Sequence, residues 1–479
     1  MSPHVDRPHP MRSLLILGGA ALAYSLAQTM LIPALGELTT QLGTDASGIA
    51  WVLTAYLLAA AVATPVAGRL GDMFGKRRML VISLLLFGAG STVAALGRSL
   101  ELVVVGRALQ GLGGGIFPLC FGIIRDEFPR ERVASSIGLI SAIFGIGGGA
   151  GLVAGGLIAD HLSYHWIFWL GTITAALAAL ATHVWVPESP ERTPGRIDVR
   201  GAVLLGVGLV LPLFAISRAN DWGWGAPRTL GLIAAGLAVL AVWVAVERRT
   251  EQPLADIPTL LEPPVLMTNI ATLLVGFGMF GSFLLIPQLA ELPESTGFGF
   301  GLGATGAGLL LLPGALVMLF AGPISGALGT RFGSKLPLAM GAATTSAGLV
   351  GLGLNHGSEA TVVLWAFVMS TGIGLAFAAM ANLIVEAVPP SQTGEATGIN
   401  TLARSVGAAI GSQVCAAILA GSAIAGSAVP TNDGFTAAFL VSAAVAALAA
   451  CIAVVIPRGE HQAIRARTPK REPEVLVER

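Results

Sequence analysis

Two arginines lie inside long apolar stretches of the sequence, where charged side chains are rare. Arg107 falls a few residues into one stretch, and Arg404 falls in another, one helical turn after Asn400. If these stretches cross a membrane, each charge is costly and usually serves a function. Arg107 could stabilise the ionised form of a nearby carboxylate or bind an anionic group of a ligand. Either arginine could equally bond to polar groups and fix helix packing, and the sequence leaves these interpretations open.

Acidic residues that could carry a proton are absent from the middle third of every apolar stretch. Glu37 and Asp160 lie at predicted outer ends, close to the histidines His161 and His165. Proton transfer needs a group that changes its charge, so Glu37 and Asp160 are the candidate proton carriers. Arg107, which could stabilise an ionised carboxylate, is the third candidate proton-coupling residue. Each acid could also be an ordinary residue of the membrane interface.

Polar and aromatic side chains recur within the apolar stretches and could line a ligand cavity. Each alone more often packs or forms a hydrogen bond between helices. As a set they predict an amphipathic site with a few convergent polar groups. Without buried acids, such a site should favour neutral or anionic compounds over cations. The candidate lining residues are Tyr24, Gln28, Trp51, Tyr56, Gln110, Phe280, Gln288, Asn382, Asn400 and Arg404.

The composition of the chain indicates which class of protein contains these residues. Hydrophobic residues make up 54% of the 479 residues and charged residues 11%, and the mean hydropathy is +0.79. Soluble domains carry about 25% charged residues, so this chain cannot cover an aqueous surface. A formal net charge of zero gives no indication of nucleic-acid binding. Cys120, Cys415 and Cys451 are widely spaced in apolar runs, which indicates neither a disulfide framework nor a metal site.

Fourteen apolar segments are long enough to cross a bilayer as helices, which needs about 20 residues each. Apolar runs without alternation exclude barrel strands, so the sequence predicts an all-α polytopic membrane protein. The first segment is too long for the core of a signal peptide. The predicted spans are 13–36, 47–68, 79–97, 102–123, 133–158, 166–186, 200–217, 229–246, 267–290, 304–329, 337–355, 360–385, 396–422 and 434–456.

The distribution of basic residues predicts the orientation of the chain. With the N-terminus inside, most of the Lys and Arg residues fall in inner loops and in the C-terminal tail, as the positive-inside rule requires. The sequence therefore predicts a multi-pass protein of the cell membrane with both termini in the cytoplasm. Its expected partners are the lipid bilayer, a small-molecule substrate and protons, with no nucleic acid and no nucleotide.

An internal repeat divides the chain into halves. The segment from Gly68 to Arg77 matches the segment from Gly326 to Lys335, and glycines of the fifth span match glycines of the thirteenth at nearly the same offset. Parallel repeats of six helices are a known transporter design. The predicted organisation is a six-helix bundle at 13–187, two additional spanning helices at 188–264, a second six-helix bundle at 265–457 and a polar cytoplasmic tail at 458–479.

The loop after the second span carries the most specific pattern. Its glycines allow a tight turn and close helix contact, and Asp72 can pair with a following cation or cap a neighbouring helix. Asp126, at the inner end of the fourth span, belongs to the same predicted charge cluster. The residues of this cluster are Gly68, Asp72, Gly75, Lys76, Arg77 and Asp126.

The segment GRLGDMFGKRRM resembles the signature loop of the major facilitator superfamily, and the fourteen spans resemble its drug:proton antiporter branch. The segment that begins at Arg107 resembles the family's helix-four motif, whose arginine is associated with proton coupling. The resemblance implies that the loop cluster locks the two halves together on the cytoplasmic side in the outward-open state. The glycines that resemble the helix-five antiporter motif are Gly147, Gly151, Gly155 and Gly156.

The chain departs from this family pattern at three positions. Leu152 stands where the helix-five motif has proline, so we expect a weaker kink there. Tyr24 stands where the branch usually carries an aspartate in helix one, which leaves the proton carrier unassigned. Thr330 replaces the aspartate in the second copy of the loop.

The leading functional hypothesis is a secondary transporter that exports small amphipathic compounds, such as drugs or antibiotics, in exchange for protons by alternating access. An uptake carrier or symporter for a neutral or anionic metabolite is the alternative, and a membrane-embedded enzyme is a remote one. We expect no enzyme activity, no cofactor and no metal, because no nucleophile, phosphate loop or ligand cluster has a suitable context. Gly276, Gly278 and Gly281 match a dinucleotide fingerprint, but they lie inside a span with no strand before them.

Overall fold

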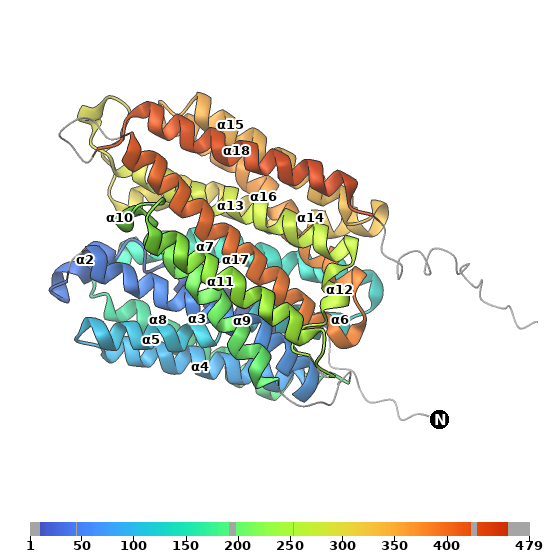
Figure 1. The fold of residues 1–479 in the computed structure, drawn as a ribbon. Helices are drawn as coiled ribbons and strands as arrows, with labels where there is room; N and C mark the ends of the chain where they lie inside the picture. The colour runs from blue at the N-terminus through green and yellow to red at the C-terminus, as the bar shows by residue number, and fades with distance from the viewer. Residues whose placement is uncertain (1–9, 45, 191–197, 252, 423–428, 458–479) are drawn as a thin grey trace, which may run out of the picture.

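The computed structural model describes residues 10–44, 46–190, 198–251, 253–422 and 429–457. Within these ranges the chain forms helices and short connections, and no strand (Figure 1). Fourteen of the described segments are long and apolar enough to cross a membrane. This number and the all-α class confirm the fold predicted from the sequence.

The first bundle is built from the N-terminal helices. In it, α7 and α8 pack against α1, α4 packs against α5 and α8, and α3 packs against α5. The short helix α2 joins α1 to α3. The bounds are α1 (Pro10–Thr29), α2 (Leu35–Gln41), α3 (Ala46–Phe74), α4 (Lys76–Leu96), α5 (Leu100–Leu112), α6 (Ile116–Glu127), α7 (Arg130–His161) and α8 (His165–Trp185).

The fourth span is broken in the middle, which the sequence analysis did not predict. Helix α5 ends at Leu112, and α6 begins at Ile116 after Gly113, Gly114 and Gly115. A Cβ on Gly114 would lie 2.8 Å from the Thr64 hydroxyl, so the break lets α3 approach closely. The Gly114 carbonyl, freed from the helix, accepts a hydrogen bond of 3.2 Å from the same hydroxyl. Backbone interruptions at membrane depth are tolerated where such partners exist.

The second bundle repeats this arrangement. Helix α13 packs against α17 and α18, α15 packs against α16 and α18, and α14 packs against α16. Two short 3-10 helices, η1 and η2, lie in the connections. The bounds are α13 (Pro263–Glu291), η1 (Glu294–Thr296), α14 (Ala304–Phe332), α15 (Lys335–Leu354), α16 (Glu359–Ala387), η2 (Pro390–Gln392), α17 (Thr393–Gly421) and α18 (Asn432–Val455).

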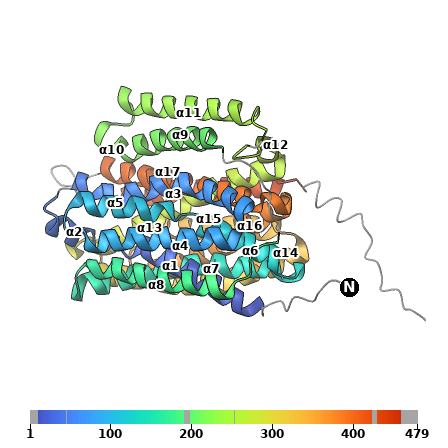
Figure 2. The same cartoon turned by 90° about the horizontal axis from the view of Figure 1, so that it is seen from below.

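Four helices connect the bundles: α9 (Val199–Ser217), α10 (Ala219–Trp222), α11 (Pro227–Glu247) and α12 (Ile257–Leu261). Figure 2 shows α9 and α11 outside the two bundles, next to α3 and α17. Helix α9 contacts α3 from the first bundle and α17 from the second, whereas α11 packs on α9. The inserted helices therefore cover the seam between the bundles.

The bundles meet through two symmetry-related helix pairs, α7 with α14 and α3 with α17. Gly138 of α7 lies against Gly322 and Pro323 of α14, and Gly398 of α17 lies against the matching pair, Thr64 and Pro65, of α3. The sequence repeat thus has a counterpart in the packing. An even number of spans puts the start of α1 and the end of α18 at the same end of the molecule, here called the termini end. The opposite end, which carries α2 and α10, is called the far end.

Candidate functional site

A cavity of about 790 Å³ lies between the two bundles. Its walls come from α1, α3, α5 and α7 on one side and from α13, α14 and α17 on the other. Residues at the far end, such as Pro33, Glu291 and Gly303, line its mouth. The volume is within the range of pockets that hold small organic molecules.

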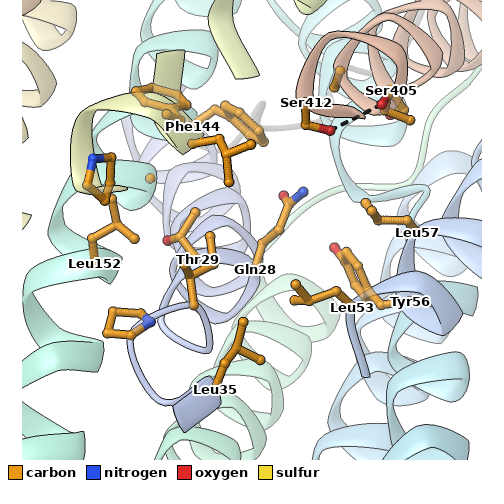
Figure 3. Close-up of a pocket in the computed structure, with 18 of the residues that line it drawn as sticks. Gln28, Thr29, Leu35, Leu53, Tyr56, Leu57, Phe144, Leu152, Ser405 and Ser412 are labelled. Atoms are coloured by element: carbon orange, nitrogen blue, oxygen red, sulfur yellow. Dashed lines mark hydrogen bonds between the residues drawn. The ribbon is translucent and has the colours of Figure 1, made fainter. Parts of the chain in front are cut away.

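The lining of the cavity is mainly apolar, with a few polar groups. Figure 3 shows the side chain of Gln28 extending into the space enclosed by Phe144, Tyr56 and Ser412. The Gln28 amide is partly exposed and has no protein hydrogen bond within the described part of the chain. The lining combines this amide with hydroxyls and aromatic rings, which suits an amphipathic ligand. The polar lining residues include Tyr24, Gln28, Thr29, Tyr56, Thr64, Arg107, Gln288, Glu291, Thr401, Arg404, Ser405 and Ser412.

Arg404 projects from α17 into this cavity. Its side chain lies over the ring of Phe377, 4.2 Å from the centroid, and over that of Phe144 at 5.1 Å. These two rings stack 5.0 Å apart, one from each bundle. Within the described residues, no carboxylate lies within 4.0 Å of the guanidinium and no protein group accepts a hydrogen bond from it. The contacts that the described residues make with this charge include the two cation–π contacts, which favour it.

Arg107 also borders the cavity, but polar groups of the protein surround it. Its Nε donates to the Val52 carbonyl at 3.0 Å, and its Nη1 donates to Gln110 Oε1 at 2.7 Å. The Gln110 amide in turn donates to Ser91 at 2.5 Å. The guanidinium also lies 4.3 Å from the ring centroid of Tyr56. These bonds link α3, α4 and α5, which agrees with the interpretation that Arg107 fixes helix packing.

The two candidate tyrosines form part of an aromatic floor. The ring centroids of Tyr24 and Tyr56 are 6.2 Å apart, and Tyr24 also packs against Phe87 and Phe117. Both tyrosines are buried and line the cavity. Tyr24, at the position where the resembling branch has an aspartate, thus supplies an aromatic surface instead of a charge.

Three other residues that were predicted to line the cavity, all with side-chain amides, lie outside the described lining. Gln110 and Asn400 are bonded inside their bundles, and Asn400 donates to Asn269 and Thr272. Asn382 donates to the Ala134 carbonyl at 3.2 Å, across the bundle interface. These three amides are buried structural groups, because each has polar partners on a neighbouring helix.

Trp51 also differs from the expectation of a cavity residue, whereas the prediction for Phe280 stays untested. The ring of Trp51 lies 5.5 Å from that of Phe214 on α9, so it contacts the inserted helices. It is outside the described lining. Phe280 belongs to α13, but its side chain lies outside the described residues.

The proposed proton carriers are at the far end, away from Arg107. Glu37 Oε1 accepts hydrogen bonds from Gln41 and from the Tyr164 backbone N–H, and its buried Oε2 has no partner. Asp160 accepts a hydrogen bond of 2.7 Å from Thr305, which links α7 to α14. Neither acid is in the described cavity lining, which contains Glu291 instead. Glu291 lies just beyond the predicted span 267–290, and no pattern in the sequence indicates that it faces the cavity.

The termini end is closed by the loop that follows α3. Asp72 accepts hydrogen bonds from the backbone N–H groups of Gly394 and Glu395, at 3.2 and 3.0 Å. These groups begin α17, so Asp72 caps a helix of the other bundle, where the helix dipole favours a negative charge. Gly68 contacts the backbone of Gly394 directly, and a Cβ there would collide with it. This close approach explains the glycine.

Lys76 is the buried cation of this cluster. Its Nζ lies 2.7 Å from Asp126 and 3.3 Å from Asp72, with no exposure to solvent. Arg77, which the sequence analysis placed in the same cluster, lies instead against Glu188 at 3.6 Å, and Glu188 accepts from its backbone N–H. Gly75 begins α4 with a φ of 106°, which favours glycine. The turn therefore directs Lys76 to Asp72 and Asp126, and the next cation, Arg77, to Glu188.

Two further arginines cross between the bundles at the termini end. Arg125 of α6 donates to the Val388 carbonyl at 2.7 Å and to Thr393 at 2.5 Å, at the connection between α16 and α17. Arg69 lies 3.7 Å from Glu395. The sequence analysis counted both arginines only as topology signals. Their cross-bundle role depends on which helix ends meet, and no local pattern reveals that.

The second copy of the loop is weaker. Ser334 and Glu386, the counterparts of Lys76 and Asp126 in the repeat, are joined by a hydrogen bond of 2.7 Å. Thr330 is exposed and bonds only to its own helix, at the Ala327 carbonyl. The cap that Asp72 provides has no equivalent there, so the closure is asymmetric.

The glycines of α7 let this helix approach its neighbours. A Cβ at Gly147 or Gly151 would collide with residues of α1, and one at Gly155 would collide with Met30, directly after α1, whereas Gly156 faces Thr305 of α14. Leu152 lies in the cavity wall within a helix that runs unbroken from Arg130 to His161. The four motif glycines therefore determine helix packing beside the cavity.

The sequence was compared with protein families and curated proteins. A profile of the Major Facilitator Superfamily matches residues 17–412. The chain is 28% identical to the tetracenomycin C resistance and export protein of Streptomyces glaucescens, over 86% of this chain and 77% of that protein. It is 27% identical to multidrug resistance protein 3 of Bacillus subtilis (strain 168), over 83% and 77%.

Other comparisons extend the range of similar proteins. A uridine/deoxyuridine transporter of Lactococcus lactis subsp. cremoris (strain MG1363) is 31% identical, over 82% of this chain and 83% of that protein. Among solved structures, the human organic anion transporter MFSD10 superposes with a TM-score of 0.65 at 16% identity, covering 93% of this chain and all of the other. With the family match across most of the sequence and the same fold, the chain belongs to the Major Facilitator Superfamily and is a membrane transporter.

Proposed function

We propose that this transporter exports small amphipathic compounds across the cell membrane in exchange for protons, with both termini in the cytoplasm. The observation that carries the proposal is the cavity between the two repeated bundles, whose lining reaches the far end of the described structure, whereas the Asp72 cluster joins the bundles at the termini end. With the termini inside, this conformation is outward-facing. Rocking of one bundle against the other would then expose the same cavity to the cytoplasm.

The closure at the termini end is the second part of the proposal. Asp72, Lys76 and Asp126 join α3, α4 and α6 to the start of α17, and all three side chains are almost fully buried. We propose that this cluster, together with Gly68 and Gly75, locks the outward-facing state. Arg77 supports it indirectly, by fixing the start of α4 through Glu188.

The direction of transport rests on two supporting observations. Two of the similar proteins are named for resistance or export. The glycines Gly147, Gly151, Gly155 and Gly156, which resemble the antiporter motif, line the contact between α7 and its neighbours. Both favour export.

Uptake of a neutral or anionic metabolite is a second candidate function. It is favoured by the similarity to a uridine/deoxyuridine transporter. Transport into inside-out membrane vesicles with an acidic lumen, and therefore an outward proton gradient, separates the two functions. Export requires accumulation in these vesicles, whereas an uptake symporter would empty preloaded ones.

The experiment that tests the proposed function is transport in proteoliposomes with an imposed pH gradient. Anionic, neutral and cationic compounds of similar size are compared side by side. We expect proton-driven movement of neutral or anionic compounds, since two arginines and a single acid, Glu291, are the charged residues in the described cavity lining. Strong preference for quaternary cations, or no response to the gradient, would contradict the proposal.

We propose that Glu37 and Asp160 exchange the protons at the far end, while Arg107 keeps the cavity wall positive. The double variant Glu37→Gln, Asp160→Asn should lower gradient-driven transport at least tenfold and leave substrate counterflow without a gradient unchanged. Glu294→Gln, at an exposed acid of the same end, is the matched control. Full proton-driven transport by the double variant would exclude these carriers, and Glu291→Gln would then test the acid that lines the cavity mouth.

A further inference from the structure

We propose that Arg404 binds the anionic group of the substrate, and that the preferred substrates are organic carboxylates with an apolar, aromatic body. This inference rests on the proposed function and specifies the substrate class of the same cavity. It begins with the state of the Arg404 side chain. Only 7% of its surface is exposed, yet the described residues offer it neither a carboxylate nor a hydrogen-bond acceptor.

An unpaired guanidinium is unusual at this depth. The group carries five N–H donors, and buried polar groups almost always have partners. Arg107 provides an internal comparison, because its donors reach Val52 and Gln110. Arg404 lines the same cavity and lacks such partners. The donors that the protein leaves unsatisfied are therefore available to a ligand inside the cavity.

The aromatic rings orient Arg404 without neutralising it. Phe144 comes from α7 and Phe377 from α16, and their stacked pair lies beneath the guanidinium at the seam of the two bundles. Cation–π contacts are worth about 0.5–2 kcal/mol and leave the positive charge in place. A carboxylate, by contrast, matches the guanidinium with two parallel hydrogen bonds.

The electrostatic surroundings favour an anion over any other ligand charge. The described titratable groups that face the cavity are Tyr24, Tyr56, Arg107 and Glu291. Glu291 is exposed at the mouth, whereas Arg107 has the same sign as Arg404. Two cations within low-dielectric walls make the empty cavity positive, and an entering carboxylate compensates this charge.

The remainder of the cavity specifies the body of the ligand. Tyr24, Tyr56, Phe117 and Phe144 present ring surfaces, and Gln28 supplies an amide that has no protein partner in the described structure. Flat aromatic groups pack well against such rings. The cavity therefore fits a molecule with one carboxylate, an aromatic body and one further polar group.

The test uses three ligands that differ mainly in charge: 2-naphthoate, 2-naphthamide and 2-naphthylmethylammonium. Binding to the full-length protein in nanodiscs is measured by titration calorimetry at neutral pH. We expect 2-naphthoate to bind at least tenfold more tightly than the other two. Equal binding of the three ligands, or preference for the ammonium compound, would overturn the inference without requiring any variant to fold.

The variant Arg404→Gln should weaken 2-naphthoate binding at least tenfold and change 2-naphthamide binding less than threefold. Arg404→Lys should retain part of the preference, because it keeps the charge but loses the paired hydrogen bonds. Arg331→Gln removes an exposed arginine at the termini end and is the matched control. An unchanged anion preference in a folded Arg404→Gln protein would show that another group binds the anion.

The failure of this inference is distinguishable from the failure of the proposed function. If gradient-driven transport of neutral compounds persists while no anion preference exists, the transporter function stands and the Arg404 assignment fails. If anions bind at Arg404 but no compound moves in proteoliposomes, the site stands and the proposed transport fails.

Discussion

At the scale of single residues, the buried charges decide what each end of the molecule does. Between the two bundles, Arg404 is a cation that lines the cavity. At the termini end, Asp72 is an anion with two backbone donors and Lys76 within reach. Breaking a buried, hydrogen-bonded charge cluster costs more than the same change at the surface, because the partner is left unpaired.

The variant Asp72→Asn should therefore weaken the closure at the termini end. It keeps one hydrogen-bond acceptor but removes the negative charge that Lys76 and the start of α17 share. We expect transport to fall at least fivefold and cysteine probes at the termini end to react faster. The control is Asp221→Asn, which removes an exposed acid paired with Arg218. If Asp72→Asn closed and transported normally, Asp126 and Glu395 would be sufficient to keep the termini end closed.

The Arg125 contacts predict a similar effect by a different route. Arg125→Gln removes hydrogen bonds to Val388 and Thr393, which connect α6 to the opposite bundle. We expect transport to fall two- to fivefold, a smaller loss than for Asp72→Asn. The hydrogen-bond partners that Arg125→Gln leaves behind are carbonyls and a hydroxyl, and these groups carry no charge. Initial transport rates in proteoliposomes measure this loss. If the losses of Arg125→Gln and Asp72→Asn add up in the double variant, the two contacts act independently.

At the scale of helices, the glycine-rich run of α7 determines how closely α1 and α14 approach. Two glycines of this run, Gly148 and Gly155, differ in how closely other residues approach them. A Cβ on Gly155 would collide with the backbone of Met30, whereas a Cβ on Gly148 would meet nothing within 4 Å. A glycine inside a helix costs about 1 kcal/mol of stability relative to alanine. The close contact with Met30 explains the glycine at position 155, whereas no comparable contact explains the one at position 148.

We therefore expect Gly155→Ala to destabilise the protein by about 1–3 kcal/mol, through overpacking against α1. Gly148→Ala should be neutral or slightly stabilising. Thermal unfolding of the two detergent-purified variants provides the comparison. Equal melting temperatures would indicate that α1 can shift to accommodate the added methyl group.

At the scale of the whole molecule, the fold places one cavity between two repeats that are joined asymmetrically. The termini end carries the Asp72 cap and the Arg125 bridge, while the second copy of the loop lacks the cap at Thr330. Alternating access requires these contacts to break while the mouth of the cavity closes. The two ends should then move in opposite directions.

Spin-label distances test this motion in a cysteine-free background. One pair joins Arg78 to Thr330 at the termini end, and the other joins Arg98 to Glu294 at the far end, all at exposed positions. In the presence of saturating substrate, the first distance distribution should shift to longer values and the second to shorter ones. Parallel changes at both ends would be inconsistent with rocking of two bundles about a central site.

The sequence by itself determined that the chain spans a membrane, how many spanning segments it has, and that it contains a repeat. These follow from composition and segment length, because a bilayer imposes one length scale on every span. It also identified Asp72, because a glycine-flanked acid at a helix end has few roles other than pairing or capping. Tyr24, Gln28, Tyr56, Gln288 and Arg404 were predicted as cavity residues, and the structure brings them together.

Only the tertiary structure decided which polar side chains face the cavity and which are satisfied inside the protein. Gln110, Asn382 and Asn400 have the same polarity as Gln28, but partners on neighbouring helices occupy their amides. Trp51 lies instead against the inserted helices. An apolar helix has no amphipathic period to reveal its inward face, so rotation about each helix axis is fixed by packing alone. That rotation leaves Arg404 without a hydrogen-bond acceptor among the described residues and gives Arg107 several.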